Sequence, residues 1–293
     1  MRRKSTSLLS LPQKKITAGL KRLMSAGVLP DNWLAMLNAD EVAMRPVSDA
    51  FASLVRPSVP PDQLDVADSD SQARCRELFG ADFFGVKEAA GPYGYAFTPH
   101  EVEERKAVRI LGRDGSILSE EQSWDLIRRC HDEAPGEFVC CIGVPHSTYA
   151  VYAKHTDVFH PAYRTSPWFG EADQRTKWAD KTVPDFWFLL RKEVADKSWG
   201  RSAADQEGWL PKAHPCERFA LPQHLVYGHA LCAKATSGKL RLYSGDRWAR
   251  TLTRAVRGNL VGVRCGPGGL SVNAWYDAPG AFIGVASLWT SEI

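Results

Sequence analysis

The residue types that bind zinc gather in one stretch of the chain, which contains Cys130, His131, Cys140, Cys141 and His146. Thiolate and imidazole groups are the usual ligands of structural zinc. Compact zinc sites place two ligands two to four residues apart on a tight turn, and this stretch contains no such pair. Cys140 and Cys141 instead belong to an apolar run that is typical of a buried strand. We therefore expect neither a bound metal nor a cofactor.

A cysteine nucleophile requires a nearby base and a partner that orients this base. The chain offers His155, His160, His214 and Cys216, but no local signature joins a thiol to a histidine. The sequence therefore does not favour an enzymatic function. A Cys/His-dependent enzyme with its site in the 130–160 region is one alternative. The glycine-rich stretch 264–269 lacks the lysine and the following helix of a phosphate-binding loop, so it predicts a hairpin turn.

Binding chemistry is suggested by two stretches with strand-like alternation. In residues 269–276, Leu270 and Val272 fall on one face, whereas serine, asparagine and tryptophan fall on the other. In residues 247–256, a tryptophan and two arginines share a face. Flat aromatic rings beside short polar groups and arginines are typical of recognition surfaces. We predict an exposed binding patch that contains Trp248, Arg250, Arg254, Ser271, Asn273, Trp275 and Tyr276. An alternative interpretation, equally supported, makes Trp248 a core residue and the arginines solvated.

These side chains must be positioned by the C-terminal part of the chain, residues 215–293. Pro222 is suited to the first turn of a helix, and Gly238 to its end. After this helix the pattern predicts short strands separated by glycine-rich turns, at 239–243, 247–256, 259–265, 269–276 and 281–289. The sequence therefore predicts a helix followed by a compact antiparallel β meander.

The sequence as a whole predicts an α+β fold, and it divides the chain into three parts. Residues 1–56 form a basic helical segment, the proline-rich and acidic residues 57–70 a linker, and residues 71–293 an α+β body. Helix starts are predicted at Thr98 and Ser119, each followed three residues later by a glutamate or a glutamine. The first 29 residues contain no acidic residue, and a nucleic acid is a possible partner for their basic side chains: Arg2, Arg3, Lys4, Lys14, Lys15, Lys21 and Arg22.

The composition of the 293-residue chain is that of an ordinary globular protein, with 44% hydrophobic and 24% charged residues. Its formal net charge of +3 is too small to indicate nucleic-acid binding by itself. Seven cysteines without a Cys-x-x-Cys pair favour reduced thiols and a cytoplasmic protein. No apolar run is long enough to span a membrane.

From about residue 75 onward, several stretches carry a resemblance to a known family: 97–107 (FTPHEVEERKA), 184–198 (PDFWFLLRKEVADKS), 205–206 (DQ), 226–227 (VY), 236–240 (TSGKL), 269–277 (GLSVNAWYD) and 284–287 (GVAS). The chain resembles uncharacterised proteins from phage-related and small-genome prokaryotic contexts. The C-terminal end of these proteins is similar to the C-type-lectin-like variable domain of diversity-generating-retroelement targets. The resemblance implies a ligand-binding face built from short strands and loops.

Three functions follow as alternatives. The first is a ligand-binding or display protein that uses the C-terminal face, with an unknown protein or glycan as ligand. The second is a nucleic-acid-associated or phage structural protein that uses the basic N-terminal arm. The third is the Cys/His-dependent enzyme.

Overall fold

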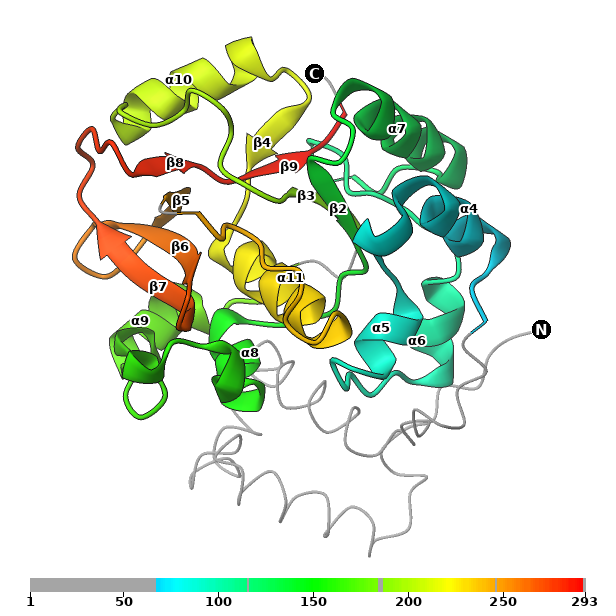
Figure 1. Cartoon of the computed structure of the whole chain (residues 1–293), viewed down its shortest axis with the longest axis horizontal. Helices are drawn as coiled ribbons and strands as arrows, with labels where there is room; N and C mark the ends of the chain where they lie inside the picture. Colours follow the sequence, from blue (N-terminus) through cyan, green and yellow to red (C-terminus); the bar gives the residue numbers. More distant parts are fainter. Residues whose placement is uncertain (1–66, 115, 184–186, 246, 292–293) are drawn as a thin grey trace, which may run out of the picture. The chain divides into compact units, whose positions relative to one another are not determined.

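The computed structural model describes residues 67–114, 116–183, 187–245 and 247–291 and shows an α+β fold (Figure 1). The predicted helical segment 1–56, most of the linker 57–70 and the basic side chains expected to contact nucleic acid lie outside the described residues. Among the described residues, no helix combines the length and the apolar character that crossing a bilayer requires.

The helices are α4 (Asp70–Phe79), α5 (Val86–Ala90), α6 (Pro99–Glu104), α7 (Glu120–Glu133), α8 (Thr148–Lys154), α9 (Ala172–Gln174), α10 (Ala203–Ala213) and α11 (Pro222–Ala235). Short 3-10 turns are η2 (Gly80–Asp82), η3 (Thr156–Val158), η4 (Pro161–Tyr163) and η5 (Trp168–Gly170), and η6 (Arg175–Ala179) is a π-helical turn. The strands are β1 (Phe83–Phe84), β2 (Phe138–Cys141), β3 (Phe188–Arg191), β4 (Glu217–Phe219), β5 (Trp248–Arg254), β6 (Leu260–Gly266), β7 (Gly269–Trp275), β8 (Ile283–Val285) and β9 (Ser287–Trp289).

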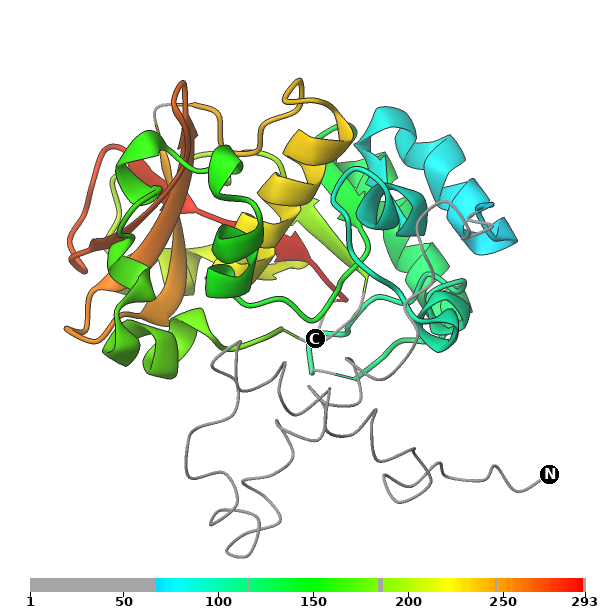
Figure 2. The ribbon, with the colours of Figure 1, turned by 90° about the horizontal axis from the view of Figure 1, so that it is seen from below.

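The described strands form two sheets. The larger sheet has the order β1-β2-β3-β9-β4, with β1 parallel to β2 and the other pairs antiparallel. The smaller sheet has the order β7-β6-β5-β8, in which β5, β6 and β7 are antiparallel neighbours and β8 is parallel to β5. Helix α11 contacts β6 of the smaller sheet and β1 and β3 of the larger one, so it lies in the core between them (Figures 1 and 2).

Local signals explain where the helices begin. The hydroxyl of Thr98 accepts a hydrogen bond from the Glu101 backbone N–H, and the Glu101 carboxylate accepts one from the Thr98 N–H. Ser119 and Gln122 form the same capping box at the start of α7. Pro222 occupies the first turn of α11, as predicted. These three helix starts are confirmed.

Cys140 and Cys141 show how the larger sheet is covered. Successive residues of a strand point to opposite faces. The Cys140 thiol hydrogen-bonds to Cys75 of α4, and the Cys141 thiol to Cys232 of α11, so these two helices cover opposite faces of β2. Both strand cysteines are fully buried, as the apolar run predicted. On the α11 side the approach is close, because a Cβ added to Gly228 would lie 2.6 Å from Cδ2 of Leu190 in β3.

Two predictions about the C-terminal strands are wrong. Residues 239–243 do not form a strand: Leu242 and Tyr243 lie in a turn, where Tyr243 adopts a φ of 55° that is incompatible with an extended strand. Residues 281–289 do not form one strand: the chain leaves the smaller sheet after β8 and enters the larger sheet as β9. The predicted antiparallel meander is therefore limited to β5, β6 and β7, with β8 returning to pair in parallel with β5.

Candidate binding site

The register of the smaller sheet brings most of the predicted binding residues onto one face. Gly262 pairs with Arg250 on one side and with Asn273 on the other, Arg264 pairs with Ser271, and Leu260 pairs with Trp275. Directly paired residues share a face of the sheet. The opposite face carries Leu270 and Val272, which are fully buried, so the predicted division of β7 into two faces is confirmed.

The prediction that this whole face is exposed is wrong for three residues. Arg250 is 1%, Ser271 8% and Trp248 9% exposed. Ser271 is covered by Tyr163, whose phenol is hydrogen-bonded to it. Arg250 and Trp248 are covered by the loop 276–282, which folds back along β5 so that the Phe282 carbonyl accepts a hydrogen bond from the Trp248 backbone N–H. Sequence alternation specifies a face but does not reveal a loop that returns over it.

Arg250 is a structural group that holds this loop. Its Nη2 donates to the Ala278 carbonyl oxygen at 2.9 Å, and its Nη1 donates to Oε1 of Gln206 in α10 at 3.0 Å. Asp277 of the same loop accepts a hydrogen bond from the backbone N–H of Ala203 at 2.9 Å, at the start of α10. The guanidinium therefore ties the loop to the sheet and to α10.

The other predicted residues remain accessible to different degrees. Asn273 and Trp275 are half-buried, and Tyr276 is 77% exposed. Arg254 is exposed at the far end of β5, where it donates to the Gly258 carbonyl oxygen at 2.8 Å. Arg254 also pairs with Asp277 at 3.8 Å, and Leu260 of the intervening strand pairs with both Arg254 and Trp275.

Trp248 and Trp275 form one side of a cavity of about 420 Å³, whose lining residues are Trp248, Arg264, Trp275, Gly280, Phe282 and Ile283. We call this cavity the aromatic pocket. The two indole rings lie 5.3 Å apart between centroids, with their planes inclined by 62°. Phe282, at the end of the returning loop, is 65% exposed. A pocket of this size with apolar walls has the dimensions of a small-ligand site.

Gly262 provides the space in which Trp275 lies. A Cβ at this position would come within 3.2 Å of Cδ1 of the Trp275 indole. Contacts this close are rare, so any side chain here would push the ring away from β6. The indole therefore packs over the backbone of the neighbouring strand, beside Trp248.

Arg264 supplies the charge of the aromatic pocket. Its guanidinium carbon lies 5.2 Å from the centroid of the Trp248 ring, in the range of a cation–π interaction. Within the described residues Arg264 forms no ion pair with a carboxylate, and its Nε is buried without a hydrogen-bond partner. The Nε1 of Trp275 is also buried and unpartnered within the described residues. A buried donor left unpaired costs about 1–3 kcal/mol. Because atoms this buried cannot be reached from the cavity, the donors that Arg264 offers a ligand are its two terminal nitrogens, Nη1 and Nη2.

Sequence reasoning did not identify Arg264, Phe282 and Ile283 as site residues. A signal for Arg264 was present, because alternation in β6 places it two residues from Gly262 on the face of the predicted patch. Phe282 and Ile283 join the aromatic pocket only through the returning loop, a contact that no local pattern encodes.

The cysteines considered for catalysis lie in the core together with His155, whereas His131, His146, His160 and His214 are partly exposed. Burial raises the pKa of the thiols of Cys130, Cys140 and Cys141, which keeps them protonated at neutral pH. Burial also lowers the pKa of His146 and of His155 to about 4. Within the described residues, no group of three or more Cys, His, Asp or Glu side chains has a metal-binding arrangement. This geometry does not favour the Cys/His-dependent enzyme.

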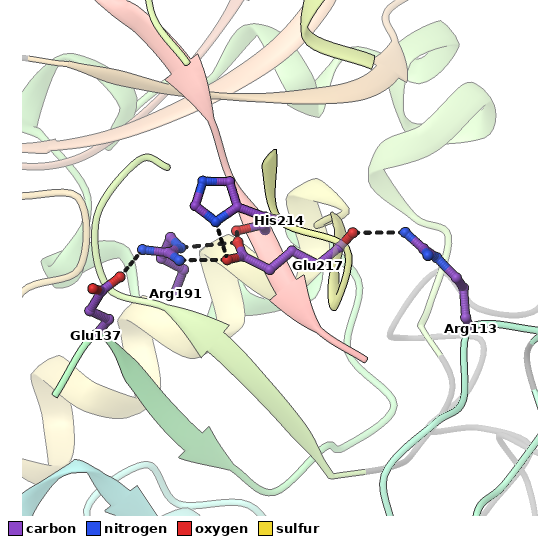
Figure 3. Close-up of polar contacts among 6 residues, drawn as sticks. Arg113, Glu137, Arg191, His214 and Glu217 are labelled. Atoms are coloured by element: carbon purple, nitrogen blue, oxygen red, sulfur yellow. Dashed lines mark hydrogen bonds and ion pairs between the residues drawn. The ribbon is translucent and has the colours of Figure 1, made fainter. Parts of the chain in front are cut away.

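Arg191 forms a buried ion network with two carboxylates (Figure 3). Its Nε donates to Oε2 of Glu217 at 3.0 Å, its Nη2 donates to Oε1, and its Nη1 donates to Glu137. Nδ1 of His214 lies 3.1 Å from Oε1 of Glu217, and the Ser287 hydroxyl donates to Oε2. Burial alone would raise the pKa of Glu217, but the hydrogen bonds from His214 and Arg191 outweigh it and lower this pKa to about 2.

The network borders a larger cavity of about 790 Å³, which we regard as a less suitable binding site. Five of the charged groups that line it have partners in the protein: Glu137, Arg191, Lys192, Glu193 and Arg241. Glu137 is paired with Arg191, Lys192 with Asp82, and Glu193 accepts a hydrogen bond from Ser244. The aromatic pocket is smaller, but three aromatic side chains line it, whereas no aromatic residue is among the described residues that line the larger cavity, and that difference decides between the two.

Comparison of the chain with protein-family models, curated proteins and solved structures gave no match.

Proposed function

We propose that this chain is a ligand-binding protein and that its binding site is the aromatic pocket. The observation that carries this proposal is the combination of two tryptophans and an arginine without an ion-pair partner within the described residues around one cavity of about 420 Å³. Phe282, which lines this cavity and is 65% exposed, extends the apolar surface at its edge. Exposed aromatic groups clustered around a cavity are typical of an interaction site.

The residues have distinct roles in this proposal. Trp248 and Trp275 offer ring faces on which a flat apolar group packs, and Arg264 offers a positive charge and hydrogen-bond donors. Arg250 does not touch the ligand but fixes the loop that carries Phe282. A binding role agrees with the ligand-binding face that the resemblance to lectin-like variable domains implies, and that resemblance forms part of the proposal.

The proposal is tested by labelling the protein with 5-fluorotryptophan and recording ¹⁹F NMR spectra with a panel of probes. The panel contains monosaccharides and disaccharides, aromatic and aliphatic carboxylates, and the corresponding amides. The ten tryptophan resonances are assigned through single Trp→Phe variants. Binding in the aromatic pocket should shift the resonances of Trp248 and Trp275, while core Trp178, which is 2% exposed, should not respond.

Two outcomes would contradict the proposal. One is a panel in which no probe shifts Trp248 or Trp275. The other is a set of shifts confined to tryptophans outside the aromatic pocket, which would place binding elsewhere in the protein.

A further inference from the structure

The lining of the aromatic pocket is unbalanced in its hydrogen-bonding groups. Arg264 and Trp275 carry donors only, since neither a guanidinium nor an indole accepts hydrogen bonds. The remaining lining residues are Trp248, Gly280, Phe282 and Ile283, whose side chains offer no acceptor. Asn273 lies on the same face, but its Oδ1 already accepts the Ala274 N–H at 2.9 Å. Among the described residues, the side chains that line this pocket therefore provide hydrogen-bond donors but no acceptors.

This imbalance restricts the ligand. A neutral sugar presents many hydroxyl donors, which need carboxylate, amide or carbonyl acceptors when they are buried. The aromatic pocket would leave these hydroxyls unpaired. A carboxylate, in contrast, presents acceptors only and carries the charge opposite to that of Arg264.

The apolar walls restrict the rest of the molecule. Trp248, Trp275 and Phe282 provide ring surfaces, and Ile283 is 6% exposed at the base of the returning loop. A charged group in such surroundings is favourable only when it is paired. The ligand that suits both features has an apolar body and one carboxylate.

We infer that the aromatic pocket binds a hydrophobic carboxylate, whose apolar body packs between Trp248, Trp275 and Phe282 and whose carboxylate accepts hydrogen bonds from Arg264. This inference rests on the proposed function and specifies its ligand class. The same chemistry is presented by a free aromatic acid and by the C-terminal residue of a peptide that ends in phenylalanine.

The test compares 3-phenylpropionate with 3-phenylpropanamide, a pair that differs in charge but hardly in shape. Affinities are measured from the ¹⁹F shifts of Trp248 and Trp275 in the full-length protein. Because a hydrogen bond to a charged group contributes more than a neutral one, the carboxylate should bind about 10- to 100-fold more tightly than the amide. An acetylated Ala-Ala-Phe peptide with a free C-terminus, compared with its C-terminal amide, distinguishes the peptide source from the free acid.

Variants assign the preference to Arg264. Arg264→Gln should remove the difference between carboxylate and amide, whereas Arg264→Lys, which keeps the charge, should retain part of it. Arg257→Gln is the matched control, because it removes an exposed arginine from the turn between β5 and β6, outside the aromatic pocket, and should leave both affinities unchanged. A melting temperature close to that of the native chain confirms that each variant is folded.

The outcomes separate this inference from the proposed function. Equal affinities for carboxylate and amide, or a preference that survives in Arg264→Gln, would overturn the inference while the proposed function stands. A saccharide that shifts the resonances of Trp248 and Trp275 when neither carboxylate does so would also overturn the inference and leave the proposed function standing. A pocket that responds to no probe of either panel overturns both.

Discussion

The buried carboxylate of Glu217 gives the most quantitative test of how this fold is held together. Its side chain is completely buried, and it is bound by Arg191, His214 and Ser287. The usual pKa of 4.5 is lowered to about 2 in the folded protein. At about 1.4 kcal/mol per pKa unit, this difference corresponds to a contribution of about 3 kcal/mol to the free energy of unfolding at neutral pH.

The pH dependence of this contribution has a definite sign. Because the pKa is lower in the folded state, the contribution is fully present above about pH 4.5 and is lost as the pH falls towards 2. We therefore expect Glu217→Gln to lower the free energy of unfolding by about 3 kcal/mol at pH 7. The gap between the native chain and the variant should narrow as the pH falls from 4.5 to 2. The measurement is urea unfolding followed by tryptophan fluorescence at pH 7, 4 and 3.

Glu137→Gln is the matched control, because Glu137 pairs with the same arginine but its side chain is 51% exposed (Figure 3). An exposed ion pair contributes little, so this change should cost less than about 1 kcal/mol. Equal costs for the two substitutions would refute the reasoning from burial. A cost for Glu217→Gln that does not change between pH 7 and pH 3 would refute the assigned pKa.

Three further predictions concern packing and the loop over the sheet. Gly228→Ala should lower the free energy of unfolding by about 1–3 kcal/mol, because the added Cβ would lie 2.6 Å from Leu190. Gly208→Ala in α10, where nothing lies within 4 Å of the added Cβ, should instead raise it by up to about 1 kcal/mol. Urea titrations measure both changes. Arg250→Met should cost about 1–3 kcal/mol and speed proteolysis within 276–282, since the loop loses its hydrogen bonds to this guanidinium. Trp275→Ala should abolish probe binding; a stability loss as large as the 3–5 kcal/mol typical of a core tryptophan would contradict its place at the pocket wall.

The features that could be predicted from the sequence are those that neighbouring residues determine. The capping boxes at Thr98 and Ser119 need only side chains three residues apart, and both were correct. The hairpin of β6 and β7 turns at Pro267 and Gly268, within the predicted glycine-rich turn. Alternation in β7 was also correct, because a strand with one buried face fixes which residues point inward.

The features that could not be predicted depend on segments that are distant in the sequence. Ala286 separates β8 from β9, and only the position of the larger sheet explains why a continuous apolar run is divided between two sheets. The burial of Arg250 depends on a loop that returns from residues 276–282 and on Gln206 in α10. Neither contact leaves a periodic trace in the sequence.

The contrast between Arg250 and Arg264 shows what distinguishes a structural arginine from a candidate ligand-binding one in this sheet. Both lie on the face of the sheet that carries Trp248 and Trp275, so residue type and strand alternation cannot distinguish their roles. Both terminal nitrogens of Arg250 donate to groups that hold the loop in place, a backbone carbonyl and a glutamine, while its Nε is buried without a partner within the described residues. Arg264 lies beside an aromatic ring, and its guanidinium forms no ion pair with a carboxylate within the described residues. An arginine whose donors are used within the fold has little left to offer a ligand, so the binding role belongs to Arg264.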